Sequence, residues 1–94
     1  MIGTSPIISI SIISHLQAAL VKNLLVDMER QCNSCHLEVL LTLNLPEALL
    51  FNVADFSFPI IIHTNLAPQG FAANQNQAFA KSSGQYFCVM NPDI

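Results

Sequence analysis

The chain has few charged residues and no tryptophan. Only 10% of its 94 residues are charged, three Lys or Arg and six Asp or Glu, against about 25% in an average soluble protein. The three cations, Lys22, Arg30 and Lys81, are scattered along the sequence and form no basic stripe that could bind a phosphate backbone. The net charge is −3 and the pI is near 5.3, so we expect no nucleic-acid partner.

Long hydrophobic runs are also missing. The longest candidates, residues 7–13 and 59–62, have the length of strands and are bounded or broken by Ser or His. A bilayer-spanning helix needs about 18 or more apolar residues. A secretory signal would require a positively charged segment before its apolar stretch, and no Lys or Arg precedes the first apolar stretch of this chain. We therefore expect no membrane span and a cytoplasmic location.

Hydrophobic residues, in contrast, make up 52% of the chain, which is too high a share for a disordered segment. The length is that of one small domain, so we expect a single domain over residues 1–94. So few charges leave apolar surface uncovered, and such surface usually marks an interaction site. We expect a homo-oligomer. The odd cysteine count, Cys32, Cys35 and Cys88, without an export signal predicts reduced thiols.

The hydrophobic pattern predicts alternating strands and helices. The β-branched run at residues 7–14 is apolar at most positions, which is typical of a strand buried on both faces. Ser14 and Gln17 have the spacing of a capping box, and apolar residues then recur at helical intervals to about Glu29. The remaining predicted elements are strands at 37–45, 58–64 and 86–90, a loop or short helical turn at 46–58, and a helix at 71–81.

Two glycines are expected to shape the chain between these elements. Gly70 is expected to supply a positive φ in the turn at 65–70, and Gly84 to terminate the second helix. The order β-α-β-β-α-β predicts an α/β fold with a mostly parallel, Rossmann-like sheet flanked by helices. In such sheets ligands bind outside the carboxyl ends of the strands. The candidate site residues therefore follow the strands, at positions 14–15, 44–47, 64–70 and 91–93.

Two stretches carry a resemblance to a known family. They are Asn65-Leu66-Ala67-Pro68-Gln69-Gly70-Phe71-Ala72-Ala73-Asn74-Gln75-Asn76 and Gly84-Gln85-Tyr86-Phe87-Cys88-Val89-Met90-Asn91-Pro92-Asp93. They resemble the N-terminal, nucleotide-sugar-binding half of family 2 glycosyltransferases, in particular the rhamnosyltransferase-like members. Residues 8–15 and 37–40 are similar to the first and second strands of that family. The resemblance covers nearly the whole chain.

The resemblance implies a GT-A-type half-domain that binds a nucleoside-diphosphate sugar for glycosyl transfer in polysaccharide or cell-surface glycan synthesis. It also implies Mg²⁺ or Mn²⁺, with Asp93 as the metal ligand, because a carboxylate at a strand end can hold such a cation beside a diphosphate. The nucleotide-sugar contacts that it implies are Ser14, His15, Asn44, Glu47, Asn65, Gly70, Asn74, Asn76 and Asn91. The family's catalytic base follows the Asn-Pro-Asp strand, and this sequence ends one residue after Asp93. We therefore name no catalytic residue and expect an incomplete catalyst.

Several of these residues also have structural interpretations. Asn74 and Asn76 lie near a helix start and would cap or solvate that helix, and Asp93 would be a solvated acid. His15 would be satisfied by the start of the first helix, and His63 is expected in a core or cross-sheet role.

Two other functions remain open. The first is a non-catalytic binding or oligomerising module of the same fold. The second rests on Cys32-Asn33-Ser34-Cys35-His36, which matches the C-x-x-C-H signature of c-type haem attachment. The missing export signal and the strand-rich pattern oppose a small helical cytochrome. The same run could form a thioredoxin-like redox site, but it follows a helix instead of preceding one, where the helix dipole would lower a thiol pKa. A zinc site would need further ligands, and Cys32, Cys35 and His36 with the distant Cys88 are a possible set.

Overall fold

Four parallel strands form one sheet with the order β3-β2-β1-β4 in the computed structural model, which describes residues 6–31 and 36–93. The elements are β1 (Ile8–Ser14), α1 (Ala18–Gln31), β2 (Leu37–Leu43), the 3-10 turn η1 (Val53–Asp55), β3 (Ile60–Thr64), α2 (Phe71–Lys81) and β4 (Tyr86–Met90). The expected α/β fold is confirmed, and all the strand pairs are parallel. Neither helix is long and apolar enough to cross a membrane in this part of the chain.

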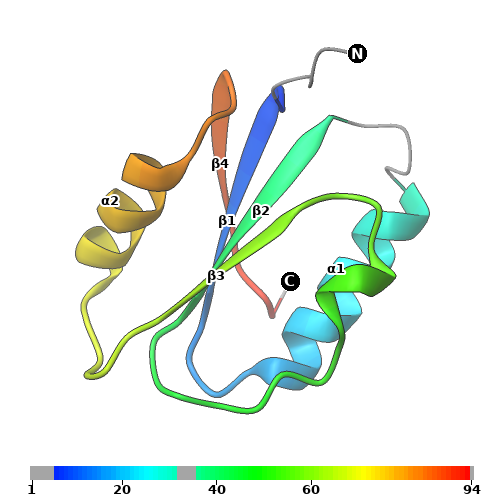
Figure 1. Cartoon of the computed structure of the whole chain (residues 1–94). Helices are drawn as coiled ribbons and strands as arrows, with labels where there is room; N and C mark the ends of the chain where they lie inside the picture. The colour runs from blue at the N-terminus through cyan, green and yellow to red at the C-terminus, as the bar shows by residue number, and fades with distance from the viewer. Residues whose placement is uncertain (1–5, 32–35, 94) are drawn as a thin grey trace.

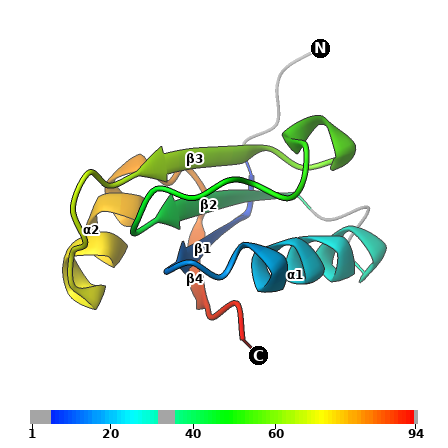
Figure 2. The same cartoon turned by 90° about the horizontal axis from the view of Figure 1, so that it is seen from below.

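The molecule has three layers (Figure 1). Seen from the β3 edge, α1 covers one face of the sheet and α2 covers the other, and the view from below in Figure 2 shows the same arrangement. The connection from β1 through α1 to β2 runs toward the β3 edge of the sheet, and the connection from β3 through α2 to β4 runs toward the opposite edge. Because the two connections run in opposite directions, their helices lie on opposite faces of the sheet. The strand order therefore reverses between β1 and β4.

The face under α1 holds the hydrophobic core. Alternate residues of β1 and β2, such as Ile12 and Leu41, point to this face and pack against Val21 and Leu25 of α1. The segment between β2 and β3 closes the core at one side, where Phe58 is buried and Phe51 and Phe56 are partly buried. The rings of Phe51 and Phe56 meet edge to face with centroids 5.7 Å apart, and those of Phe56 and Phe58 are tilted with centroids 5.5 Å apart.

The face under α2 is polar. Ser9 and Ser11 of β1 are completely buried there, and the Ser11 hydroxyl donates a 2.6 Å hydrogen bond to Oε1 of Gln75 on α2. Small side chains on the strand allow the helix to lie close to the sheet, and each buried polar atom needs a partner. This layer is therefore held by hydrogen bonds where the α1 layer is held by apolar packing.

Both glycine expectations are wrong. Gly70 has φ −75° and ψ 169°, an extended conformation open to any residue, and it precedes α2 as the N-cap. The helix α2 ends at Lys81, where the Ser82 amide and hydroxyl both donate to the carbonyl of Phe79. Gly84 lies beyond that end, and a Cβ there would come within 2.6 Å of Ser9 Oγ and 2.8 Å of Ser9 N. Close approach to β1 is what requires glycine at position 84.

Element boundaries differ slightly from those expected. The strand β2 ends at Leu43 instead of Leu45, β3 begins at Ile60 instead of Phe58, and α1 continues to Gln31. Pro59 precedes β3 and has no amide hydrogen, so its carbonyl alone joins the ladder by accepting from Val39 N at 2.9 Å.

Candidate functional site

The turn between β1 and α1 forms the first part of the site. Ser14 Oγ accepts a hydrogen bond from Gln17 N at 3.2 Å, so the serine half of the expected capping box is present. Glu47, from the segment after β2, accepts from Ser14 Oγ at 2.7 Å and from Leu16 N at 3.1 Å. Leu16 has φ 60°, the left-handed conformation that costs a non-glycine residue about 1–2 kcal/mol. Glu47 therefore fixes a strained turn at the carboxyl end of β1.

A second group, which we call the amide cluster, consists of Asn44, Asn65, Asn74 and the backbone of Gln69. Asn44 Oδ1 accepts from Asn65 Nδ2 at 3.0 Å, from Asn74 Nδ2 at 3.1 Å and from Gln69 N at 2.8 Å. Asn65 Nδ2 also donates to Asn74 Oδ1 at 2.8 Å. The three asparagine side chains are at least nine-tenths buried. The cluster ties the carboxyl ends of β2 and β3 to the first turn of α2.

His15 connects the turn to the amide cluster. Asn44 Nδ2 lies 3.1 Å from His15 Nδ1, and because an amide nitrogen can only donate, Nδ1 accepts and the proton of the neutral ring is on Nε2. The side chain of His15 is otherwise exposed. The imidazole therefore presents an N–H donor at the carboxyl end of β1.

The end of β4 supplies the remaining candidates. Asn91 and Asp93 are exposed, with buried Pro92 between them. Within residues 6–31 and 36–93 no three His, Cys, Asp or Glu side chains are grouped as a metal site would require. A single exposed carboxylate suits a Mg²⁺ ion, which proteins often hold through one or two carboxylates while phosphates and waters supply its other ligands. Asp93 fits that minimal case.

Most of the expected residues lie in two groups at the carboxyl end of the sheet. Ser14 ends β1 and His15 follows it, and Asn91 and Asp93 follow β4, the parallel neighbour of β1. The amide cluster and Glu47 lie on the β2 side of β1. Gly70 lies before α2, and Asn76 is an exposed residue in the middle of that helix.

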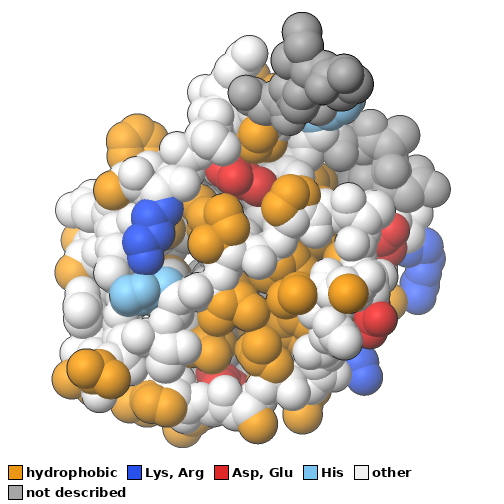
Figure 3. Space-filling model, viewed as in Figure 1, with side chains coloured by type: hydrophobic (Ala, Val, Ile, Leu, Met, Phe, Trp, Pro, Cys, Tyr) orange, Lys and Arg blue, Asp and Glu red, His pale blue; other side chains and the backbone are white. Residues whose placement is uncertain are grey.

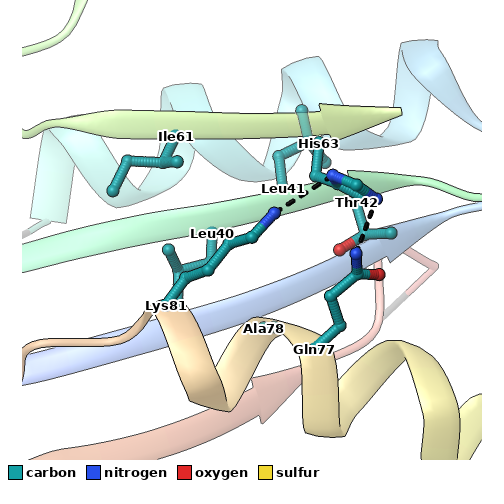
Figure 4. A pocket seen from close by; sticks show the side chains of 8 residues that line it. All are labelled: Leu40, Leu41, Thr42, Ile61, His63, Gln77, Ala78 and Lys81. Atoms are coloured by element: carbon teal, nitrogen blue, oxygen red, sulfur yellow. Dashed lines mark hydrogen bonds between the residues drawn. The ribbon is translucent and has the colours of Figure 1, made fainter. Parts of the chain in front are cut away.

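His63 of β3 was expected in a core or cross-sheet role, and its hydrogen-bond partners on α2 were not anticipated. His63 Nδ1 lies 3.1 Å from Lys81 Nζ, and His63 Nε2 lies 2.8 Å from the amide nitrogen of Gln77 (Figure 4). His63 Nε2 also lies 3.0 Å from Asn65 Oδ1. The ammonium of Lys81 donates to Nδ1 of His63, so the proton of the neutral imidazole is on Nε2. Oε1 of Gln77 is buried and has no hydrogen-bond partner among the described residues in this amide orientation. With the amide turned so that Oε1 faces His63, the Nε2–H group donates to this oxygen. The cross-sheet role expected for His63 is therefore a link from β3 to α2.

Glu38 is a second unanticipated group, at the amino ends of the strands. Its carboxylate is 4% exposed and accepts from Ser9 Oγ at 2.6 Å, from Ser83 N at 2.7 Å and from Ser83 Oγ at 3.1 Å. Burial raises the pKa of Glu38, but these hydrogen bonds to the charged form outweigh it and hold the pKa below its ordinary value. The only signal in the sequence is that Glu38 is the one charged residue in a mostly apolar run.

Cys32 and Cys35 lie outside the described residues, so the C-x-x-C-H run is represented only by His36, which is exposed. The backbone carbonyl of His36 accepts from Ile7 N at 2.8 Å and from Ile8 N at 3.2 Å. Its role in the described part of the chain is to join the amino ends of β1 and β2.

The surface is as apolar as the composition suggested. Figure 3 shows hydrophobic side chains over the middle of the side that faces the viewer in Figure 1, with charged side chains around them. Ile61 and Leu50, for example, are 42% and 49% exposed.

No protein-family model matches this chain, and neither a curated protein nor a solved structure is significantly similar to it.

Proposed function

We propose that this chain binds the nucleoside-diphosphate part of a sugar donor at the carboxyl ends of β1 and β4, as a glycosyltransferase-like domain. The observation that carries the proposal is the reversal of strand order between these two strands. A reversal point in a parallel sheet leaves a crevice between the loops that leave adjacent strands in opposite directions, and ligands bind there. The resemblance of residues 65–76 and 84–93 to family 2 glycosyltransferases supports the same location.

Each of the two strand ends has a proposed role. At β1, the exposed Nε2–H of His15 is a donor for a ribose or phosphate oxygen, held in position by Asn44. At β4, the amide of Asn91 and the carboxylate of Asp93 are exposed. In this proposal Ser14, Glu47 and the amide cluster position the loops, because their hydrogen bonds join residues of the chain to one another.

A divalent cation, when bound, would neutralise the negative charge of the diphosphate. Asp93 would be its protein ligand, because it is the exposed carboxylate beside the proposed phosphate position. The end of β1 would then hold the base and ribose, and the end of β4 would hold the phosphates. A cytoplasmic location belongs to the same proposal and is tested by fractionation of cells that produce the chain.

Isothermal titration of the purified chain with nucleoside diphosphates, with and without Mn²⁺, tests the proposal. We expect one nucleotide to bind in the presence of Mn²⁺ and binding to be lost in Asp93→Ala. The matched control is Asp55→Ala, which removes another exposed aspartate, from η1 before β3. Equal losses in both variants, or no binding by any nucleotide, would contradict the proposal.

The absorption spectrum of the purified chain tests the covalent haem alternative, because a colourless preparation without a Soret band would exclude it. That measurement uses the same purified sample and depends on no feature of the donor site.

A further inference from the structure

The outer side of β4 is an unprotected edge. This strand pairs with β1 on one side and with no other strand among those described. The Tyr86 amide donates to Ile7 O at 2.9 Å, so the backbone groups of Tyr86, Cys88 and Met90 face β1. The backbone groups of Phe87 and Val89 therefore face outward. Such free donors and acceptors form a template for another strand.

The two edges of the sheet differ in the features that block such pairing. At the β3 edge, the ammonium of Lys81 on α2 lies 3.1 Å from Nδ1 of His63. Lysine is a residue with which proteins commonly protect an edge. At the β4 edge, residues 82–92 contain no Lys, Arg, Asp or Glu. A second strand can approach β4 without opposing or burying a charge.

The side chains around β4 are apolar and exposed. Tyr86 is 65% exposed and Val89 is 44% exposed. On the α2 side, Phe79 is 62% exposed and its ring contacts that of Phe87 in an edge-to-face arrangement, with centroids 5.2 Å apart. The edge and the adjoining flank of α2 therefore form one apolar strip, which we call the β4 edge.

We propose that the β4 edge is the interface of a homodimer in which β4 pairs antiparallel with β4 of a second copy. Antiparallel self-pairing satisfies the outward backbone groups of Phe87 and Val89 in both copies. Because the strand carries no charge, no like charges meet when the same surface of two copies is brought together. The sheet then continues from β3 through both copies of β4 to the second β3. This assembly does not depend on nucleotide binding.

The five-residue strand fixes the register. Overlap is complete only when Cys88 lies opposite Cys88 of the second copy, on the two-fold axis, because it is the central residue of Tyr86–Met90. Phe87 then faces Val89, an aromatic and β-branched pair of the kind that stabilises sheets. Since the backbone groups of Cys88 face β1, the two cysteines form a pair without hydrogen bonds, with Cα atoms about 4.5 Å apart. That distance lies within the range of disulfides.

Cys88 is a free, exposed thiol and gives a direct test of this register. In the full chain with Cys32→Ser and Cys35→Ser, we expect mild oxidation to link two chains through Cys88, as a dimer on a non-reducing gel. The control adds Cys88→Ser and moves the thiol to β3 as Ile61→Cys, an exposed position on the opposite edge. Equal cross-linking of both chains would show random collision and overturn the register.

The oligomeric state tests the interface without cysteine chemistry. Light scattering and sedimentation of the reduced, unaltered chain should give a dimer, and Val89→Glu should give a folded monomer by circular dichroism. Ile61→Glu is the matched control, because Ile61 is 42% and Val89 44% exposed on opposite edges of the sheet. A monomer at every concentration would overturn the proposal and leave the β4 edge for a different chain segment. A dimer that persists in Val89→Glu would place the interface elsewhere.

Discussion

Single buried polar residues hold the α2 side of the sheet together. Glu38 joins β1, β2 and the turn before β4 through hydrogen bonds from Ser9 and Ser83. Ser9 Oγ also accepts from Gly84 N at 2.8 Å, so one chain of hydrogen bonds crosses three segments. Removing one partner from such a group leaves the others without hydrogen bonds in a buried place, which costs more than the average hydrogen bond contributes.

The pH dependence of stability follows from the lowered pKa of Glu38. A carboxyl whose pKa is lower in the folded than in the unfolded state stabilises the fold at pH values above its unfolded pKa of about 4.3. This contribution disappears as the pH falls through the folded pKa. In Glu38→Gln the shape is kept and the charge is lost, so we expect unfolding free energy to fall by about 1–2 kcal/mol near neutral pH.

Urea denaturation of both proteins across the acid range measures this contribution. The gap between the native chain and Glu38→Gln should be constant above about pH 5 and should close as the pH falls further, because the native carboxyl is then protonated too. Glu29→Gln is the control, since Glu29 accepts from Ser57 at an exposed position. A gap that does not change with pH would show that the charge of Glu38 contributes nothing.

At the scale of elements, the sequence pattern predicted strands and helices well and their packing faces less well. The helix α1 has leucines at 20 and 24, and Leu16 lies in the turn before it, yet the residues that the helix buries are Val21, Leu25 and Met28. Both sets of apolar residues recur at helical intervals, and only the position of the sheet determines which set is buried. The helix α2 shows the converse, because its buried residues, Asn74, Gln75 and Ala78, are mostly polar and do not signal a core face.

The candidate site was predictable in position and only partly in detail. Polar residues follow each parallel strand, so their common location at one edge could be predicted from the strand pattern. The hydrogen bonds among Asn44, Asn65 and Asn74 could not, because residues that are 30 positions apart meet only after α2 has packed on the sheet. The same reason hid Glu38, whose partner Ser83 is 45 positions away.

The amide cluster should matter for the stability of the elements that it joins. Asn44→Ala removes an oxygen that accepts three hydrogen bonds, leaving the buried donors of Asn65 and Asn74 with fewer partners. We expect a loss of about 2–3 kcal/mol in unfolding free energy, measured by urea denaturation. Asn76→Ala is the matched control, because it removes an exposed asparagine from α2 and should change stability by less than about 0.5 kcal/mol. Equal effects of the two changes would contradict a structural role for the cluster.

The whole molecule has two unlike halves on either side of its sheet. The layer between the sheet and α1 contains the apolar cluster around Ile12, Leu25 and Leu41, all at most 1% exposed. The layer between the sheet and α2 depends on hydrogen bonds, and its helix carries exposed Phe71 and Phe79. Apolar burial is the larger source of stability, at about 25 cal/mol for each Å². Opening the α2 side should therefore require less free energy than opening the α1 side.

Hydrogen exchange under native conditions should resolve these halves. We expect amides of α1, β1 and β2 to exchange only through global unfolding, and amides of α2 to exchange through a smaller opening of lower free energy. In a dimer joined at the β4 edge, the outward amides of Phe87 and Val89 would be protected although they lie at the rim of one copy's sheet. In the Val89→Glu monomer these two positions should exchange rapidly while α1 keeps its protection. One uniform opening energy for both helices would instead mean that the polar layer is as stable as the apolar one, and that the fold opens as a single unit.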